Sequence, residues 1–114
     1  MKVPSFEQAV IPERKLTAYL LDPFHPVGGS KAKFFLGLGF SQEKWIELSE
    51  KLLLHLAENE VSRVEANKHG TKYIIDGRFE KLNGTTLNLR TAWFIRNGES
   101  LPVFVTAYPL PKKL

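Results

Sequence analysis

A glycine-rich segment in the first third of the chain holds residues that could bind an anion. Gly28-Gly29-Ser30-Lys31 has the composition of the end of a phosphate-binding loop, in which a tight turn aims backbone N–H groups at the anion and a lysine adds positive charge. The first glycine of that motif and the strand before it are missing, which argues against a nucleoside triphosphate. The segment predicts either a site for a nucleic-acid phosphate or a plain loop.

The three histidines of the chain are isolated from one another. His25 precedes the glycine pair by three residues, and an imidazole beside an anion site could act as general acid or base near neutral pH. A surface histidine without a role is the alternative. His55 and His69 lack the paired spacing of metal ligands. The chain has no cysteine, which excludes disulfides and thiolate zinc sites, so we expect neither a metal nor a cofactor.

Arg90 lies in the middle of an apolar stretch of strand-forming residues. An arginine there is out of place unless its guanidinium meets a carboxylate or a phosphate. Thr91, Thr106 and Tyr108 lie on the same or the neighbouring predicted strand, although Thr91 alternates to the face opposite Arg90. Threonine and tyrosine are also good strand formers, so a structural explanation for the three remains open.

The acidic residues give no catalytic pattern. Asp76 is the only acid at the centre of a predicted strand, and it could pair with Lys72 or Arg78. Neither a pair of carboxylates nor a Ser/His/Asp or Cys/His set is recognisable in the sequence.

Helical periodicity dominates the N-terminal half. Pro12 is suited to open a helix that ends at Asp22-Pro23. Ser30 is placed to cap a short helix over about 31–37, and Ser41 a long one over about 42–58. The apolar positions predicted to face the core are Leu16, Tyr19, Leu20, Phe34, Phe35, Leu38, Trp45, Leu48, Leu52 and Leu56.

From Val61 onward the period becomes two, which predicts strands at about 61–67, 71–81, 85–96 and 101–108. Asn83-Gly84 and Asn97-Gly98 favour two-residue type I′ hairpin turns, and 68–70 is a weaker third turn. A two-residue turn at Asn83-Gly84 places Ile74 opposite Trp93. We therefore predict an α+β fold in which N-terminal helices pack on a four-stranded antiparallel β-meander, in one domain spanning residues 1–114.

The same register assigns two faces to the sheet. The apolar face should meet the helices, whereas the other mixes aromatic with polar side chains, as binding surfaces do. The predicted apolar face carries Ile74, Leu87, Leu89, Trp93 and Ile95, and the mixed face carries Tyr73, Ile75, Phe79, Asn88, Arg90 and Phe94.

The basic excess is confined to the predicted sheet. Residues 61–114 carry nine Lys or Arg against four Asp or Glu, including Lys112 and Lys113 at the end, within a chain of net charge +4. Such a face suits RNA or DNA, since neutralised phosphates supply most sequence-independent affinity, although the cations could also only solvate the sheet. No stretch is long enough to span a membrane or forms a signal peptide, so we expect a cytoplasmic protein.

Several stretches resemble a family of short bacterial proteins known only as a domain of unknown function. Together they cover nearly the whole chain. They are Lys15 to Phe35 with its Asp22-Pro23-Phe24-His25-Pro26-Val27-Gly28-Gly29-Ser30-Lys31-Ala32-Lys33 centre, Leu38-Gly39-Phe40, His69-Gly70-Thr71-Lys72-Tyr73, Arg90-Thr91-Ala92-Trp93 and Val105-Thr106-Ala107-Tyr108-Pro109.

That family is in turn similar to the barnase, EndoU, colicin and RelE-like superfamily of ribonuclease toxins. The resemblance implies metal-independent RNA cleavage, in which the ribose 2′-hydroxyl attacks the adjacent phosphate. Active-site residues vary across that superfamily, so roles do not transfer by position; from their chemistry we assign His25 or Lys31 to proton transfer, Arg90 to the phosphate and Thr106 or Tyr108 to positioning. No strand glutamate is present to act as the base. Further expected substrate contacts are Gly28, Gly29, Ser30, Lys33, Lys72, Tyr73 and Thr91.

A ribonuclease of this kind implies RNA as substrate and a cognate inhibitor or antitoxin protein as partner, with no role for a membrane. The hypothesis requires the Arg90 guanidinium to point into a cationic pocket with His25 and Lys31. The alternative is a non-catalytic nucleic-acid- or protein-binding module that uses the same basic sheet face. A third interpretation, an interaction protein of a larger assembly, predicts an exposed apolar patch around Phe79, Phe94 and Phe104.

Overall fold

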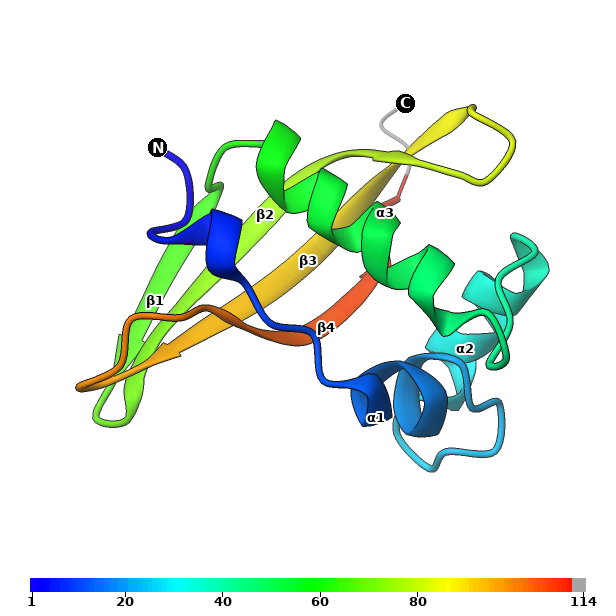
Figure 1. Ribbon diagram of the computed structural model, residues 1–114, viewed down its shortest axis with the longest axis horizontal. Helices are drawn as coiled ribbons and strands as arrows, with labels where there is room; N and C mark the ends of the chain where they lie inside the picture. Colours follow the sequence, from blue (N-terminus) through cyan, green and yellow to red (C-terminus); the bar gives the residue numbers. More distant parts are fainter. Residues whose placement is uncertain (112–114) are drawn as a thin grey trace.

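The computed structural model describes residues 1–111, so Lys112 and Lys113 lie outside the described residues. Helical segments come first and a four-stranded antiparallel sheet follows (Figure 1), which confirms the predicted α+β meander. The segments are η1 (Phe6–Gln8), α1 (Glu13–Lys15), η2 (Leu16–Leu20), α2 (Gly29–Gly37), α3 (Trp45–Glu58), β1 (Arg63–Asn67), β2 (Gly70–Glu80), β3 (Thr86–Arg96) and β4 (Val103–Pro109).

The first predicted helix is present, but its second half is wound as a π-helix. Pro12 is the residue before α1, where its missing N–H costs nothing. In η2 the amide of Leu21 bonds to the carbonyl of Leu16 at 2.7 Å, five residues back. Leu16 and Leu20 are buried while Tyr19 is only half-buried, so the wider turn directs the tyrosine to the rim of the core.

The two predicted serine caps are wrong in detail. Helix α2 begins at Gly29, so Ser30 lies inside it with an exposed side chain. Helix α3 begins at Trp45, and Ser41 Oγ instead accepts the N–H of Lys44 at 3.2 Å, in the turn that leads into the helix. Both helices nevertheless occupy the predicted stretches of chain.

The predicted register between β2 and β3 is wrong by one residue. Ile74 pairs with Ala92 and Tyr73 with Trp93. The reason is a three-residue loop, 82–84, in which the amide of Gly84 bonds to the carbonyl of Lys81 at 3.0 Å and only Gly84 has positive φ. A type I turn followed by a left-handed glycine replaces the type I′ turn, which needs positive φ at two residues.

The other two turns also differ from expectation. Asn97-Gly98 forms a turn, with the Glu99 amide bonded to the Arg96 carbonyl at 2.9 Å, but residues 97–102 then run on before β4 begins at Val103. The turn predicted more weakly, at 68–70, is the shortest of the three: only residues 68–69 connect β1 to β2, since Asn67 pairs with Gly70. The Asn67 side chain accepts N–H groups from that turn.

A β-bulge in β4 decides which side chains reach each face. Trp93 pairs with Phe104 and Ala92 with Thr106, so Val105 is the extra residue between them. Without it Thr106 would share a face with Phe104, because alternate residues of a strand point the same way. The bulge instead turns Thr106 and Tyr108 onto the face that carries Arg90.

Helix α3 covers one face of the sheet (Figure 1), here called the helix face. Its central side chains are fully buried, and they include Ile75 and Phe79, which the wrong register had assigned to the opposite face. The predicted patch of Phe79, Phe94 and Phe104 does not form, because Phe79 and Phe104 belong to the core. The fully buried positions of the helix face are Ile75, Phe79, Leu89, Thr91, Trp93, Phe104 and Ala107.

The opposite face, here called the outer face, presents three rows of side chains across β2, β3 and β4. The rows are Asp76–Arg90–Tyr108, Ile74–Ala92–Thr106 and Lys72–Phe94–Val103. The segments η2 and α2 lie beyond the β4 edge (Figure 1) and contribute side chains to this face.

Within residues 1–111, no helix has the length and apolar character that a membrane crossing needs.

Candidate functional site

Three polar groups from three segments meet on the outer face. The ammonium of Lys31 in α2 donates to the Tyr19 hydroxyl of η2 at 2.9 Å and to Thr106 Oγ1 of β4 at 3.2 Å. The two hydroxyls lie 3.0 Å apart. All three side chains are half-buried, so the group is held by the protein yet open to a ligand. We call these residues the lysine–hydroxyl triad.

The phenol of Tyr19 is the electrostatically perturbed member. Burial opposes its ionisation, but hydrogen bonds with Lys31 and Thr106 and the charges of Lys31 and Lys15 outweigh burial and lower the Tyr19 pKa below its usual value. The ammonium groups of Lys15 and Lys31 lie 5.4 and 5.5 Å from the centre of its ring. Two cations therefore stabilise a phenolate at this position.

His25 borders the triad through the Tyr19 ring. The two ring centres are 5.1 Å apart in an edge-to-face arrangement. Nδ1 of His25 accepts the N–H groups of Val27 at 3.0 Å and Gly28 at 2.9 Å. Because Nδ1 is the acceptor, a neutral imidazole here carries its proton on Nε2 and is a donor through that nitrogen.

The glycine pair allows the loop to pack closely against Tyr19 and Pro23, and it does not form a phosphate-binding loop. A Cβ on Gly28 would lie 2.6 Å from Cδ1 of Tyr19, and one on Gly29 would lie 2.7 Å from the Pro23 carbonyl. The Gly28 amide bonds to His25 Nδ1 and the Gly29 amide to the His25 carbonyl. Both N–H groups are thus used within the loop, which corrects the expectation that they are aimed at an anion.

Tyr108 connects the triad with Arg90. Its ring lies 5.4 Å from the Lys31 ammonium and 5.9 Å from the Arg90 guanidinium. Arg90 also donates to the Tyr108 hydroxyl at 3.4 Å. Lys31 and Tyr108 further line a shallow hollow of about 510 Å³ together with Ser30, Phe34 and Pro109.

Arg90 meets a carboxylate, one of the two partners that its sequence position demanded. Its Nε and Nη2 donate to the two oxygens of Asp76 at 2.7 and 2.8 Å. This fork raises the pKa of Arg90 and lowers that of Asp76. Asp76 therefore pairs with Arg90 rather than with Lys72 or Arg78. The guanidinium lies beside the predicted site, but its charge is neutralised by Asp76. The prediction that Arg90 binds a phosphate directly is therefore wrong.

The remaining predicted contacts lie elsewhere. Thr91 is fully buried on the helix face, where its hydroxyl bonds to His55 and accepts from Trp93. Tyr73 packs against the core on the same face. Lys72 is on the outer face but pairs with Glu65 at 3.3 Å, and the Lys33 side chain is exposed on α2. The prediction that Thr91 and Tyr73 contact the substrate is therefore wrong, because both lie on the helix face.

The structure thus brings five of the predicted residues around one that the sequence analysis missed. Three of them contact Tyr19 directly, namely His25, Lys31 and Thr106. The other two join through Lys31, because the Tyr108 ring lies near its ammonium and Arg90 donates to the Tyr108 hydroxyl. The spacing of Tyr19 with Leu16 and Leu20 had placed it in the core stripe. Its position four residues after Lys15 is the one signal that pointed toward a charged environment.

No group of His, Asp or Glu side chains in residues 1–111 is arranged to hold a metal ion.

Comparison with solved structures identifies a similar fold. A chain from the "contact-dependent growth inhibition toxin - immunity protein complex" of Klebsiella pneumoniae 342 superposes with a TM-score of 0.69 over 94% of this chain and 97% of that chain, at 14% identity. No curated protein sequence matches. A family model matches residues 2–111, and the chain therefore belongs to the family described as Domain of unknown function (DUF6883).

Proposed function

We propose that this protein is a metal-independent ribonuclease of the toxin kind, with the lysine–hydroxyl triad at its active centre. The observation that carries the proposal is the contact of the Lys31 ammonium with two hydroxyls, one of which, Tyr19, has a lowered pKa. Cleavage by the ribose 2′-hydroxyl needs a proton acceptor and a cation at the phosphate. The triad supplies both within 3.2 Å.

Each group takes one role in that reaction. Tyr19, as phenolate, removes the proton of the 2′-hydroxyl and so acts as the general base. The 2′ oxygen then bonds to phosphorus as the bond to the 5′ oxygen breaks, and Lys31 stabilises the charge on the non-bridging oxygens. His25 donates a hydrogen bond from Nε2 to the departing 5′ oxygen, which takes its proton from water as the Tyr19 phenol returns one to solvent. The products carry a 2′,3′-cyclic phosphate and a 5′-hydroxyl.

Tyr108, Thr106 and Arg90 act as positioning residues. Thr106 fixes the Tyr19 hydroxyl at 3.0 Å, and the Tyr108 ring lies between the Lys31 and Arg90 cations. The Asp76 fork holds Arg90 in place, so its effect on the reaction passes through Tyr108. The similarity of fold to a chain from a toxin–immunity complex supports an inhibitor protein as a second partner.

The test is incubation of the purified protein with total RNA in the presence of a chelator. We expect fragments that end in 2′,3′-cyclic phosphate, and a loss of at least about tenfold for Tyr19→Phe and Lys31→Met, as for removal of a positioned general base or cation. Tyr73→Phe, on the helix face, and Lys44→Met, on the exposed start of α3, are the matched controls.

Expression in cells supplies a second readout. The wild-type chain should arrest growth, and Tyr19→Phe or His25→Ala should relieve the arrest. RNA left intact by wild-type protein, together with abundant expression without harm, would leave the non-catalytic binding module as the interpretation.

A further inference from the structure

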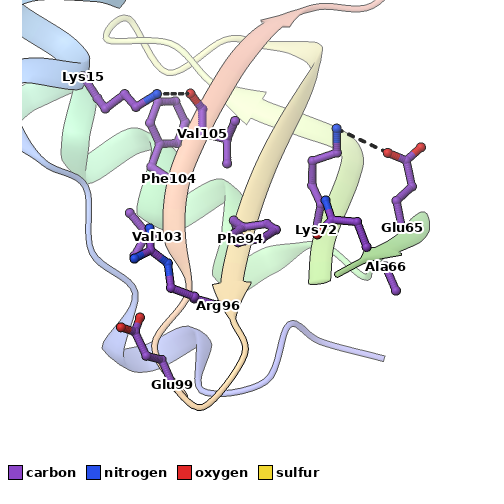
Figure 2. Close-up of a pocket in the computed structure, with 11 residues that line it drawn as sticks. Lys15, Glu65, Ala66, Lys72, Phe94, Arg96, Glu99, Val103, Phe104 and Val105 are labelled. Carbon is purple, nitrogen blue, oxygen red and sulfur yellow. Dashed lines mark hydrogen bonds and ion pairs between the residues drawn. The ribbon is translucent and has the colours of Figure 1, made fainter. Parts of the chain in front are cut away.

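A second hollow on the outer face begins where the lysine–hydroxyl triad ends. It has a volume of about 640 Å³, within the range of ligand pockets, and Figure 2 draws its walls. Lys15 belongs to both places, because its ammonium lies over the Tyr19 ring and donates to the Val105 carbonyl at 3.3 Å. That carbonyl belongs to the extra residue of the β4 bulge.

An aromatic ring lies at the centre of this hollow. Phe94 is half-buried on the outer face, and its ring extends across the sheet toward Lys72 (Figure 2). Its Cζ comes so near Gly70 that a Cβ on that glycine would lie 2.8 Å away. The glycine therefore lets the tip of the ring lie against β2, where the Phe94 side chain lines the hollow.

Cations stand around the ring in excess of carboxylates. Lys15, Lys72 and Arg96 line the hollow with Glu65 and Glu99. Glu65 is already paired with Lys72 and Arg63. Within residues 1–111, neither Lys15 nor Arg96 forms an ion pair with a carboxylate. Their charge is available to an anionic ligand.

From this arrangement we propose that the Phe94 hollow binds a nucleobase of single-stranded RNA, stacked on the ring, while Lys15 and Arg96 contact the flanking phosphates. A base has an aromatic face that stacks on phenylalanine, and cations along the backbone complete such sites. The proposal rests on the proposed function and extends it, since it names the nucleotide next to the one cleaved at the triad.

The spacing along the sheet fits one strand of RNA that runs over both places. Phe94 follows Ala92 by two residues on β3, and Ala92 pairs with Thr106 of the triad. Two residues of strand span about 7 Å, which a neighbouring nucleotide can bridge. The hollow and the triad thus form one track along the β4 side of the outer face.

The experiment measures binding without cleavage, by fluorescence anisotropy of a short 2′-O-methyl RNA whose attacking oxygen is blocked. We expect Phe94→Leu, which keeps apolar bulk over Gly70 but lacks a ring, to weaken binding roughly 5- to 160-fold, in line with about 1–3 kcal/mol per stacked base. Phe94→Trp should restore it. Ile46→Ala, an exposed apolar residue on α3, is the control that should bind like wild type.

An oligomer of the same charge with an abasic residue at each position in turn separates stacking from electrostatics. Wild-type protein should prefer the base-containing strand, and Phe94→Leu should lose that preference. Equal binding of base-containing and abasic strands would overturn the proposal and leave the hollow to an acidic protein partner. Thermal melting of each variant checks folding, and Arg96→Ala, at an exposed position, supplies a variant that leaves the packing over Gly70 intact.

Failure of this inference is distinguishable from failure of the ribonuclease proposal. Phe94-dependent binding of the blocked RNA by a protein that does not cleave would uphold the hollow and reject the catalytic site. Cleavage of ordinary RNA that is indifferent to Phe94→Leu would do the reverse.

Discussion

Of the two cations that flank Tyr108, only one retains its charge for an anion. Arg90 donates through two nitrogens to Asp76, so its net field at the site is small. Lys31 contacts the hydroxyls of Tyr19 and Thr106 instead, and within residues 1–111 it has no carboxylate partner. The anion affinity of this face should therefore follow Lys31 much more closely than Arg90.

A second polar group, on the helix face, is sealed inside the protein. His55 Nε2 lies 3.0 Å from the Leu89 carbonyl and 3.3 Å from that of Gly77, while Nδ1 is 3.2 Å from the Thr91 hydroxyl. Since Trp93 donates to Thr91, the threonine proton is directed at Nδ1, and the imidazole is neutral with its proton on Nε2. Both ring nitrogens are satisfied, so this histidine is structural.

Acid should destabilise the protein through His55. Burial lowers the His55 pKa below its usual value near 6.5. Below about pH 6.5 this histidine is therefore protonated in the unfolded chain but stays neutral in the folded protein. The free energy of unfolding should be constant above that pH and fall below it by up to about 1.4 kcal/mol per unit. Urea denaturation at several pH values measures this slope.

The matched variants are His55→Gln and His69→Gln. His55→Gln should start from a lower stability, by about 1–3 kcal/mol for the lost buried hydrogen bonds, and should show a shallower decline between pH 6.5 and 5. His69 is exposed in the turn between β1 and β2, so His69→Gln should keep the wild-type slope. An unchanged slope in His55→Gln would contradict the assignment.

At the scale of elements, local signals predicted the order of helices and strands but not how the strands align. Alternation and the Asn-Gly pairs located the hairpins, because those patterns act within a few residues. Whether Asn83 itself adopts positive φ is decided by strand twist and packing, and the structure places only Gly84 there. One residue of difference in the loop moved Ile75 and Phe79 from the outer face to the core.

The parts of the site that sequence could not predict depend on two irregularities. Nothing in Val103-Phe104-Val105-Thr106 marks Val105 as the bulged residue, yet that bulge turns Thr106 toward Tyr19. The π-helical turn of η2 likewise moves Tyr19 out of the apolar stripe that its spacing predicts. Both irregularities are set by contacts between distant segments, while the chemistry of His25 and Lys31 was readable locally.

The loop between η2 and α2 should tolerate no side chain at Gly28. An added Cβ would press on the Tyr19 ring at 2.6 Å and on the Tyr19 carbonyl at 3.0 Å, so Gly28→Ala must displace the phenol from Lys31. We expect a stability loss of about 1–3 kcal/mol and a loss of RNA cleavage at least as large as in Tyr19→Phe. Thermal melting and the cleavage assay measure the two effects.

Gly37→Ala is the control for that loop, because a Cβ there meets nothing within 4 Å. Near the end of α2 it should be neutral or stabilise the helix by up to about 1 kcal/mol. Equal cleavage by Gly28→Ala and Gly37→Ala would mean that the position of the Tyr19 ring does not govern activity.

At the scale of the whole molecule, the basic excess of the sheet is smaller than the sequence count implies. Arg90 is paired with Asp76, and Lys72 and Arg63 share Glu65. The cations that remain along the β4 side of the outer face are Lys15, Lys31 and Arg96, which line the triad and the Phe94 hollow. Pairing thus leaves these three cations available along the track proposed for RNA, while Lys68, Arg78 and Lys81 elsewhere in the sheet region also form no ion pair within residues 1–111.

This distribution predicts how binding of the blocked RNA depends on salt. Each phosphate neutralised on a single strand adds about −0.7 to the slope of log affinity against log salt, so three cations give a slope of about −2. Lys31→Met should reduce its magnitude by about 0.7, whereas Lys44→Met, exposed and remote from the outer face, should leave it unchanged. Anisotropy titrations between about 50 and 200 mM salt measure the slope. Equal slopes for the two variants would mean that the whole surface, rather than the triad and its neighbours, attracts the RNA.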